Sequence, residues 1–239
     1  MSASLALSEL KAFTKKGRLS DLARFYKTGP GEYGEGDLFL GGTVPQTRSV
    51  AKKYQGLELK EVEKLFCSPF HEARLCAAII LNHKLSKAKA PQDCKKIFDF
   101  YIKQVRAERV NNWDIVDVSA PWMGVYLAEV EDPMQLLIKL SKSRSLWQRR
   151  VSMILTFAMI RKGDLQPTIT IAKLLLKDDQ DLIHKAVGWM LRELGKRDIM
   201  LLRRFLKEHS HEMPRTMLRY AIEKLPERER KQWLLESKS

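Results

Sequence analysis

Apolar residues recur at helical spacing along almost the whole chain, and this pattern limits the fold more than any other feature. It is clear in residues 75–85, 151–159 and 183–194, where apolar side chains follow the i, i+3, i+4, i+7 rule of one helix face. No segment sustains the period-two alternation of a half-buried strand. The sequence therefore predicts an all-α protein.

Helical segments of similar character recur along the chain. They begin near His71, Asn111, Leu146, Asp181 and Met213. Several follow a further predicted helix, as at Pro91–Val105, Asp132–Ser141 and Leu165–Leu176. A spacing of about 32 to 40 residues is typical of two-helix solenoid repeats. We expect a curved solenoid of antiparallel helix pairs with a concave face, forming one domain over residues 1–239. An irregular helical bundle is the alternative.

One region departs from the helical pattern. Residues 28–43 are rich in glycine and turn-forming residues. Thr43, Val44 and Pro45 then read as a helix start, because threonine caps helix N-termini and proline is tolerated in the first turn.

The charge balance indicates a polyanionic partner. Lys and Arg number 43 against 29 Asp and Glu, a formal net charge of +14. Nucleic acid is the usual partner of so basic a chain. A basic protein without such a partner is the alternative. The longest apolar run, Cys76 to Leu81, is far too short to span a bilayer, and we expect no membrane partner.

Familiar catalytic and metal motifs are missing from the sequence. The segment GPGEYGEGD at residues 29–37 lacks the GK[ST] of a phosphate-binding loop, and His71-Glu72 does not continue into HExxH. His209 and His211 have no metal-ligating set around them. Cys67, Cys76 and Cys94 form no CxxC and read as reduced thiols, which favours a cytoplasmic protein. We expect no metal and no cofactor.

Two tryptophans stand out for their surroundings. Trp113 and Asp117 lie four residues apart on one helix face beside Val116 and Ala120, so the carboxylate is partly desolvated and needs a partner or a task. Trp189 falls off the apolar stripe of its helix, which favours recognition of a ligand. The alternatives are an ion pair for Asp117 and packing against a neighbouring repeat for Trp189.

Basic residues recur on the later helices. Arg149 points away from the apolar stripe of its segment, and Arg150 lies at the edge, where it can reach a neighbouring repeat's carboxylate or hold a phosphate. Further basic residues follow on the later helices and could bind a nucleic-acid backbone together with Arg149 and Arg150. They are Arg161, Lys162, Lys185, Arg192, Arg215 and Arg219. Taken singly, each also fits a solvated surface charge.

These features are compatible with cleavage of a glycosidic bond in DNA. Two tryptophans suit a planar cationic ligand, such as an alkylated purine. A nearby carboxylate stabilises the positive charge that develops on the sugar, or orients a water molecule.

Four motifs in order carry a family resemblance. They are Phe39–Gly41 (FLG) with Pro45, Trp113–Asp117 (WDxxD), Trp147–Arg150 (WQRR) and Lys185–Glu193 (KAVGWMLRE). From about Leu22 to Leu225 the chain resembles the AlkD-type DNA alkylation repair glycosylases, which are built from HEAT-like repeats. The resemblance implies a concave basic face and monofunctional excision of cationic N3- and N7-alkylated purines from double-stranded DNA in base excision repair, without a metal.

The resemblance also implies roles for particular residues. Asp117 matches the catalytic carboxylate, Trp113 and Trp189 match the tryptophans that contact the lesion's deoxyribose, and Arg150 matches the arginine that binds the DNA backbone. Arg149, Lys185 and Arg192 are further backbone candidates. We expect a monomer in the cytoplasm, associated with the nucleoid if the source is bacterial.

The N-terminal part departs from the family pattern. The family presents a tyrosine near the lesion in an A-R-Y-like context, whereas this chain has Ala23-Arg24-Phe25-Tyr26. Phe25 takes that place with Tyr26 beside it, and both are candidate lesion contacts. A non-catalytic HEAT-like repeat protein that binds damaged or branched DNA is therefore the alternative function. A protein-interaction solenoid is a third, which the net charge disfavours.

Overall fold

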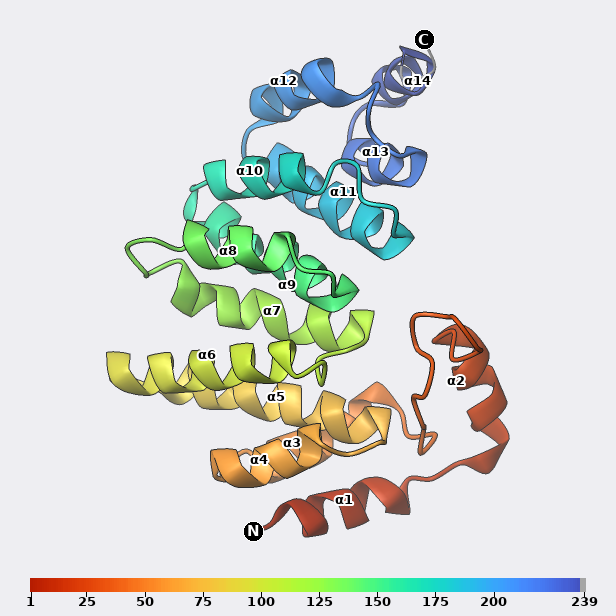
Figure 1. Cartoon of the computed structure of the whole chain (residues 1–239), viewed down its shortest axis with the longest axis vertical. Helices are drawn as coiled ribbons and strands as arrows, with labels where there is room; N and C mark the ends of the chain where they lie inside the picture. Colours follow the sequence, from red (N-terminus) through yellow and green to blue (C-terminus); the bar gives the residue numbers. More distant parts are fainter. Residues whose placement is uncertain (237–239) are drawn as a thin grey trace. The chain divides into compact units, whose positions relative to one another are not determined.

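The computed structural model describes residues 1–236, and helices make up most of that length (Figure 1). Within these residues there is no β-strand; a single backbone bridge joins Leu38 to Phe70. The all-α prediction is therefore confirmed. The elements are α1 (Ala3–Ala12), η1 (Lys16–Arg18), α2 (Leu19–Phe25), α3 (Val44–Lys53), α4 (Leu59–Phe66), α5 (His71–Lys87), α6 (Pro91–Arg106), α7 (Trp113–Leu127), α8 (Met134–Ser141), α9 (Leu146–Lys162), α10 (Gln166–Leu174), α11 (Asp181–Gly195), α12 (Ile199–His209), α13 (Arg215–Ile222) and α14 (Glu227–Glu236).

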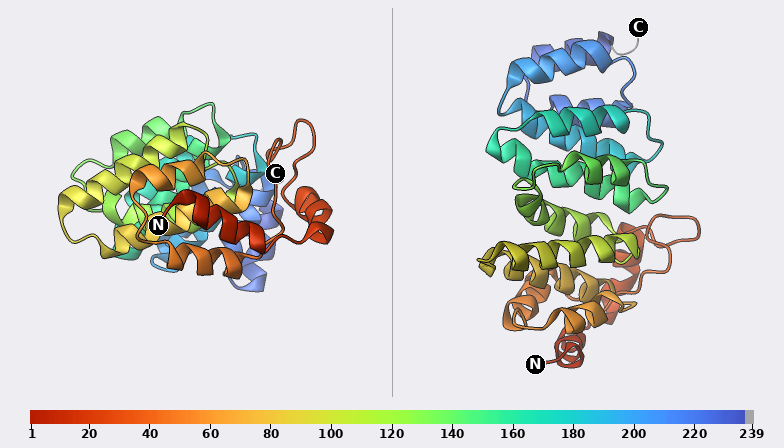
Figure 2. Two further views of the ribbon diagram at one scale, coloured as in Figure 1. Left: turned by 90° about the horizontal axis from the view of Figure 1, so that it is seen from below. Right: turned by 60° about the vertical axis from the view of Figure 1, so that its left-hand side comes forward.

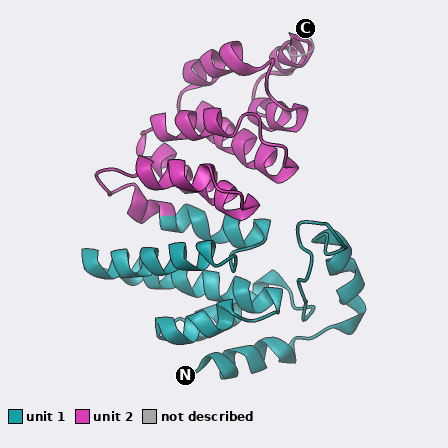
Figure 3. Cartoon of the chain, in the orientation of Figure 1, with its two compact units in different colours: residues 1–123 teal, residues 124–239 magenta. Residues whose placement is uncertain are grey.

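The chain divides into two compact units, called here unit 1 and unit 2 (Figure 3). Unit 1 comprises residues 1–123 and unit 2 begins at residue 124, so the division falls inside α7. The prediction that residues 1–239 form a single domain with a concave basic face concerns the arrangement of both units, and it stays a prediction.

Both units consist of packed helices, which Figure 2 shows from two further directions. In unit 1, α3 and α4 both pack on α5, and α6 packs on α5 and α4. In unit 2, α9, α11 and α13 pack in succession, while α8 and α10 cover α9. The helices predicted to begin near residues 71, 111, 146, 181 and 213 are α5, α7, α9, α11 and α13. The predicted arrangement of helix pairs is confirmed within each unit.

Local chemistry sets several helix boundaries, and the first of them is the predicted start of α3. Thr43 caps α3 in a capping box with Gln46, and Pro45 lies in the first turn. Ser145 caps α9 through the backbone N–H of Gln148, and the helix ends at Gly163, whose φ of +90° favours glycine.

The segment after α2 is held by a buried carboxylate. Glu72, in the first turn of α5, accepts hydrogen bonds from the backbone N–H groups of Leu40 (2.9 Å) and Gly41 (2.8 Å). Gly41 has a φ of +90°, and a Cβ there would lie 2.6 Å from the Lys15 carbonyl oxygen. The Phe39–Gly41 motif is thus explained by a tight passage that glycine alone tolerates.

The repeats of unit 2 depend on an equally close approach between two helices. At Gly188 of α11, a Cβ would lie 2.5 Å from both the Met217 carbonyl oxygen and the Tyr220 Cβ of α13. The glycine in the motif KAVGWMLRE therefore sets the distance between these two helices.

We predict that Gly188→Ala lowers the melting temperature by several degrees, because over-packing costs about 1–3 kcal/mol. Gly17→Ala is the control, since nothing lies within 4 Å of the added Cβ. On an open helix face alanine stabilises by up to about 1 kcal/mol relative to glycine. An unchanged or raised melting temperature for Gly188→Ala would show that α11 and α13 do not pack this closely.

Candidate functional site

Trp113 and Asp117 open α7, one helical turn apart. Both side chains are half-buried, whereas Val116 and Ala120 beside them are fully buried. Asn112 fixes the start of the helix: its side-chain oxygen accepts the Trp113 backbone N–H at 2.8 Å. The predicted juxtaposition of an indole and a partly desolvated carboxylate on one helix face is present in unit 1.

The end of α2 meets the start of α7 through aromatic side chains. The ring of Tyr26 stacks on Trp113, with centroids 5.6 Å apart and planes at 18°. Phe25 contacts Trp113 edge-on at 5.8 Å. The ring of Phe39 stacks on the rings of Tyr26 and His71, with centroid distances of 5.1 Å and 5.0 Å. These contacts fix the orientation of the Trp113 indole.

Phe25 and Tyr26 differ in exposure although they are adjacent. Tyr26 is 8% exposed and its hydroxyl donates to Asp114 Oδ2 at 3.0 Å. Burial, together with the Asp114 carboxylate, raises the pKa of that hydroxyl, which therefore remains a donor. Phe25 is 61% exposed, so most of its ring is open to solvent.

A buried chain of charged groups lies beneath this aromatic cluster. We call it the Asp114 network: Tyr26, Asp37, His71, Arg74, Asn112 and Asp114. His71 bridges the two carboxylates, with Nε2 at 2.9 Å from Asp114 Oδ2 and Nδ1 at 3.4 Å from Asp37 Oδ2. Arg74 donates to Asp37 Oδ1 at 2.5 Å and to the Ser68 carbonyl at 3.0 Å.

The electrostatics of the network keep His71 charged at neutral pH. Burial disfavours the imidazolium, but the charge of Asp114 and the hydrogen bonds that His71 donates to both carboxylates outweigh it and raise the pKa of His71 to about 9. Burial would likewise raise the pKa of Asp37, yet hydrogen bonds from His71 and Asn112 and the charge of Arg74 lower it. Two cations thus balance two carboxylates inside the protein.

Sequence reasoning missed this network. In the sequence, His71 belongs to an incomplete HExxH pattern, and Asp114 is only the residue that follows Trp113. The detectable signal is the pair His71 and Arg74, three residues apart and directly before the apolar run Cys76 to Leu81. Such buried cations require carboxylate partners.

In unit 2, Trp189 is half-buried on α11, with its ring 6.1 Å from Phe157 of α9. Val187, Met190 and Leu194, the stripe predicted to face the core, are fully buried. Trp189 therefore combines partial packing against a neighbouring repeat with partial exposure, which is compatible with both alternatives drawn from the sequence.

The predicted DNA-backbone cations of unit 2 already have partners within the protein. Arg149 pairs with Asp178, with Nε and Oδ2 2.6 Å apart, and Lys185 pairs with Asp181 at 2.7 Å. Arg192 pairs with Glu223. Arg150 is 4% exposed and donates to the Leu182 carbonyl of α11. Phosphate binding by these residues therefore requires that their present partners be exchanged.

Within residues 1–236, no group of three or more His, Cys, Asp or Glu side chains is placed to hold a metal ion. In the same part of the chain, no helix has the length and apolar character needed to cross a membrane.

The packed helix pairs define a HEAT-like helical-repeat protein. A sequence model described as DNA alkylation repair enzyme matches residues 6–225, so the chain belongs to the DNA alkylation repair enzyme family. No curated protein sequence matches the chain.

Two solved structures share the fold. One is described as a predicted DNA alkylation repair enzyme from Enterococcus faecalis: its TM-score is 0.68 at 15% identity, over 90% of this chain and 97% of that one. The other is described as belonging to a new family related to the HEAT-like repeat DNA glycosylases, with affinity for branched DNA structures. Its TM-score is 0.54 at 15% identity, over 89% of this chain and 83% of that one.

We predict that the stabilisation provided by His71 depends on pH. The folded-state pKa of about 9 lies above the ordinary value of 6.5, so the contribution is complete below pH 6.5 and disappears as the pH rises through 9. In urea titrations, the difference in unfolding free energy between the wild type and His71→Gln should shrink across that range. A difference that is constant with pH would contradict a charged His71.

We predict that Tyr26→Phe loosens α2 and the loop that follows it. A cavity of about 630 Å³ separates α2 from the start of α3, so α2 depends on the anchoring of its C-terminal end. Limited proteolysis should cleave the variant faster within residues 19–43. Tyr54→Phe is the matched control, because it removes a similar hydrogen bond, to Glu9 at 3.1 Å. Equal cleavage of both variants would show that the Asp114 contact does not hold α2.

Proposed function

We propose that this protein is a monofunctional DNA glycosylase that hydrolyses the N-glycosidic bond of cationic N3- and N7-alkylated purines in duplex DNA. The observation that supports it most is the geometry at the start of α7. There Trp113 and Asp117 lie one turn apart and half-buried, beside the exposed ring of Phe25. Membership of the DNA alkylation repair enzyme family supports the same class of substrate.

The proposed reaction needs only one catalytic carboxylate. An alkylated purine carries a positive charge, so the bond from C1′ to the base nitrogen breaks with its electron pair passing to the base, which leaves neutral. The deoxyribose then carries oxocarbenium character, which the negative Asp117 stabilises. Water adds its oxygen to C1′, and its proton passes to Asp117 or to solvent.

In this proposal the neighbouring aromatic residues hold the damaged nucleotide in place. Trp113 packs against the deoxyribose of the lesion and Phe25 contacts the same nucleotide from α2. Tyr26 was also a candidate contact, but its hydroxyl is bound to Asp114 and its ring is buried. Its part in the proposal is therefore to position Trp113.

The residues of unit 2 complete the proposal. Trp189 is proposed as a further aromatic contact to deoxyribose. Arg149, Arg150, Lys185 and Arg192 bind backbone phosphates by exchanging the intramolecular partners described above. A monomeric protein in the cytoplasm is part of the same proposal.

A non-catalytic protein that binds damaged or branched DNA is the second candidate. Two observations favour it: Phe25, which lacks a hydroxyl, occupies the exposed position, and a structural neighbour is described as having affinity for branched DNA. This candidate predicts DNA binding without release of base.

We predict that the wild type releases 3-methyladenine, 7-methylguanine or both from methylated duplex DNA, and that Asp117→Asn reduces the single-turnover rate by at least about 100-fold. Loss of one preorganised electrostatic group typically costs that much. Chromatography of the released bases measures the rate, and Asp99→Asn, which changes an exposed carboxylate of unit 1, is the charge-matched control. Unchanged release by Asp117→Asn would exclude the proposed role. No release by wild type with DNA binding retained would favour the second candidate.

A further inference from the structure

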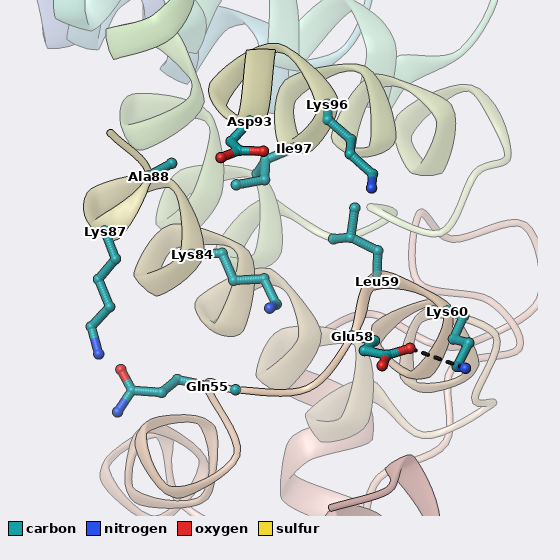
Figure 4. Close-up of a pocket in the computed structure, with 11 residues that line it drawn as sticks. Gln55, Glu58, Leu59, Lys60, Lys84, Lys87, Ala88, Asp93, Lys96 and Ile97 are labelled. Carbon is teal, nitrogen blue, oxygen red and sulfur yellow. Dashed lines mark ion pairs between the residues drawn. The ribbon is translucent and has the colours of Figure 1, made fainter. Parts of the chain in front are cut away.

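A cationic cavity of about 640 Å³ lies at one edge of unit 1, remote from the candidate site. It is formed by the segment between α3 and α4, the C-terminal end of α5 and the first turns of α6 (Figure 4). Four lysines line it: Lys60, Lys84, Lys87 and Lys96. In Figure 4 the side chains of Lys84 and Lys87 from α5 and of Lys96 from α6 extend toward the segment that contains Gln55 and Leu59.

Most of this positive charge is not neutralised by the protein. Lys60 pairs with Glu58 at 3.0 Å. Within residues 1–236, Lys84, Lys87 and Lys96 form no ion pair with a carboxylate. Asp93 and Glu58 are the acidic residues of the lining, so the lysines are in excess.

The environment of Lys84 disfavours the charge of its ammonium group in the unbound protein. Its side chain is half-buried, and burial lowers its pKa, an effect that the nearby charge of Glu58 opposes. On the adjoining surface, burial and the charges of Lys87, Lys52 and Arg48 lower the pKa of His83. Positive potential therefore extends from the cavity across α3 and α5, and an anion bound there would relieve the repulsion.

The cavity and the Asp114 network lie at opposite ends of α5. His71 is the first residue of that helix and Lys84 follows 13 residues later, near its end. At about 1.5 Å per residue the two positions are about 20 Å apart along the axis. The cavity is therefore separate from the site built around Trp113 and Asp117.

We propose that this cavity binds backbone phosphates of DNA, as a second DNA contact outside the candidate glycosylase site. Lysine ammonium groups bind phosphate as point charges, without reading sequence. The lining contains no aromatic residue on which a base could stack, so the contact is to the backbone. The proposal goes beyond the proposed function and shares with it the premise that DNA is the partner.

The test compares two triple variants with equal loss of charge. The cavity variant is Lys84→Gln/Lys87→Gln/Lys96→Gln. The control is Lys64→Gln/Lys95→Gln/Lys231→Gln, whose lysines already pair with Glu61, Asp99 and Glu227. Fluorescence anisotropy measures the affinity for an undamaged labelled duplex across a salt series.

We predict that the slope of log K against log salt becomes shallower by about 2 to 3 in the cavity variant, because each lost phosphate contact contributes about 0.9. The control slope should change by less than about 1. Equal slopes for the two variants would overturn the proposal. A second result would also overturn it: the wild type binds pyrophosphate, the cavity variant does not, and the DNA affinity of the cavity variant equals that of the control. The cavity would then bind a small phosphate ligand.

A measurement on the wild type covers the case in which the cavity variant fails to fold. DNA should protect Lys84, Lys87 and Lys96 from chemical acetylation, read by mass spectrometry, and leave Lys95 reactive. Equal reactivity with and without DNA would overturn the proposal. Base release at saturating DNA should be unchanged in a folded cavity variant. If neither the wild type nor the variants release base, the proposed glycosylase function fails. The binding and protection results still decide whether the cavity binds DNA.

Discussion

One carboxylate oxygen of Asp114 receives both the Tyr26 hydroxyl, at 3.0 Å, and the His71 ring nitrogen, at 2.9 Å. Through that oxygen the end of α2, the start of α5 and the start of α7 are tied together. Such a buried ionic contact contributes little net stability in general, but breaking it leaves an uncompensated charge and is costly. Its consequence here is geometric, because it fixes where Trp113 and Phe25 lie relative to Asp117.

The N-terminal part of α7 thus carries two carboxylates in different environments. Asp114 is enclosed by Tyr26 and His71 and serves the architecture. Asp117 lies three residues after Asp114 and is half-buried beside the indole of Trp113. In the proposed function this difference in environment gives two chemically identical groups different roles. Tyr26 and Phe25 differ in the same way, because the buried ring of Tyr26 positions Trp113 whereas the ring of Phe25 is exposed.

The periodic features of the sequence predicted the fold well. The starts of α5, α9 and α11 and the Thr43 cap follow directly from apolar spacing and capping chemistry, which are local. The pairing of Trp113 with Asp117 on one face followed from helical geometry. The Asp114 network did not, because it joins residues up to 88 positions apart across three elements. Nor does a sequence show that Arg149 and Arg192 already hold acidic partners, since those depend on which segments pack together. The pair of Lys185 with Asp181, by contrast, is local, because the two residues lie four apart on α11.

The central claim is that Asp117 acts on the sugar of an alkylated nucleotide that Trp113 holds. It is tested most directly by a crystal structure of the protein bound to duplex DNA that contains a non-hydrolysable analogue of that nucleotide. If Asp117 acts in this way, its carboxylate will lie within about 3.5 Å of C1′ or of a water molecule beside it, with the Trp113 indole against the deoxyribose. A complex in which the modified nucleotide lies away from the start of α7, with Asp117 contacting protein alone, would contradict it.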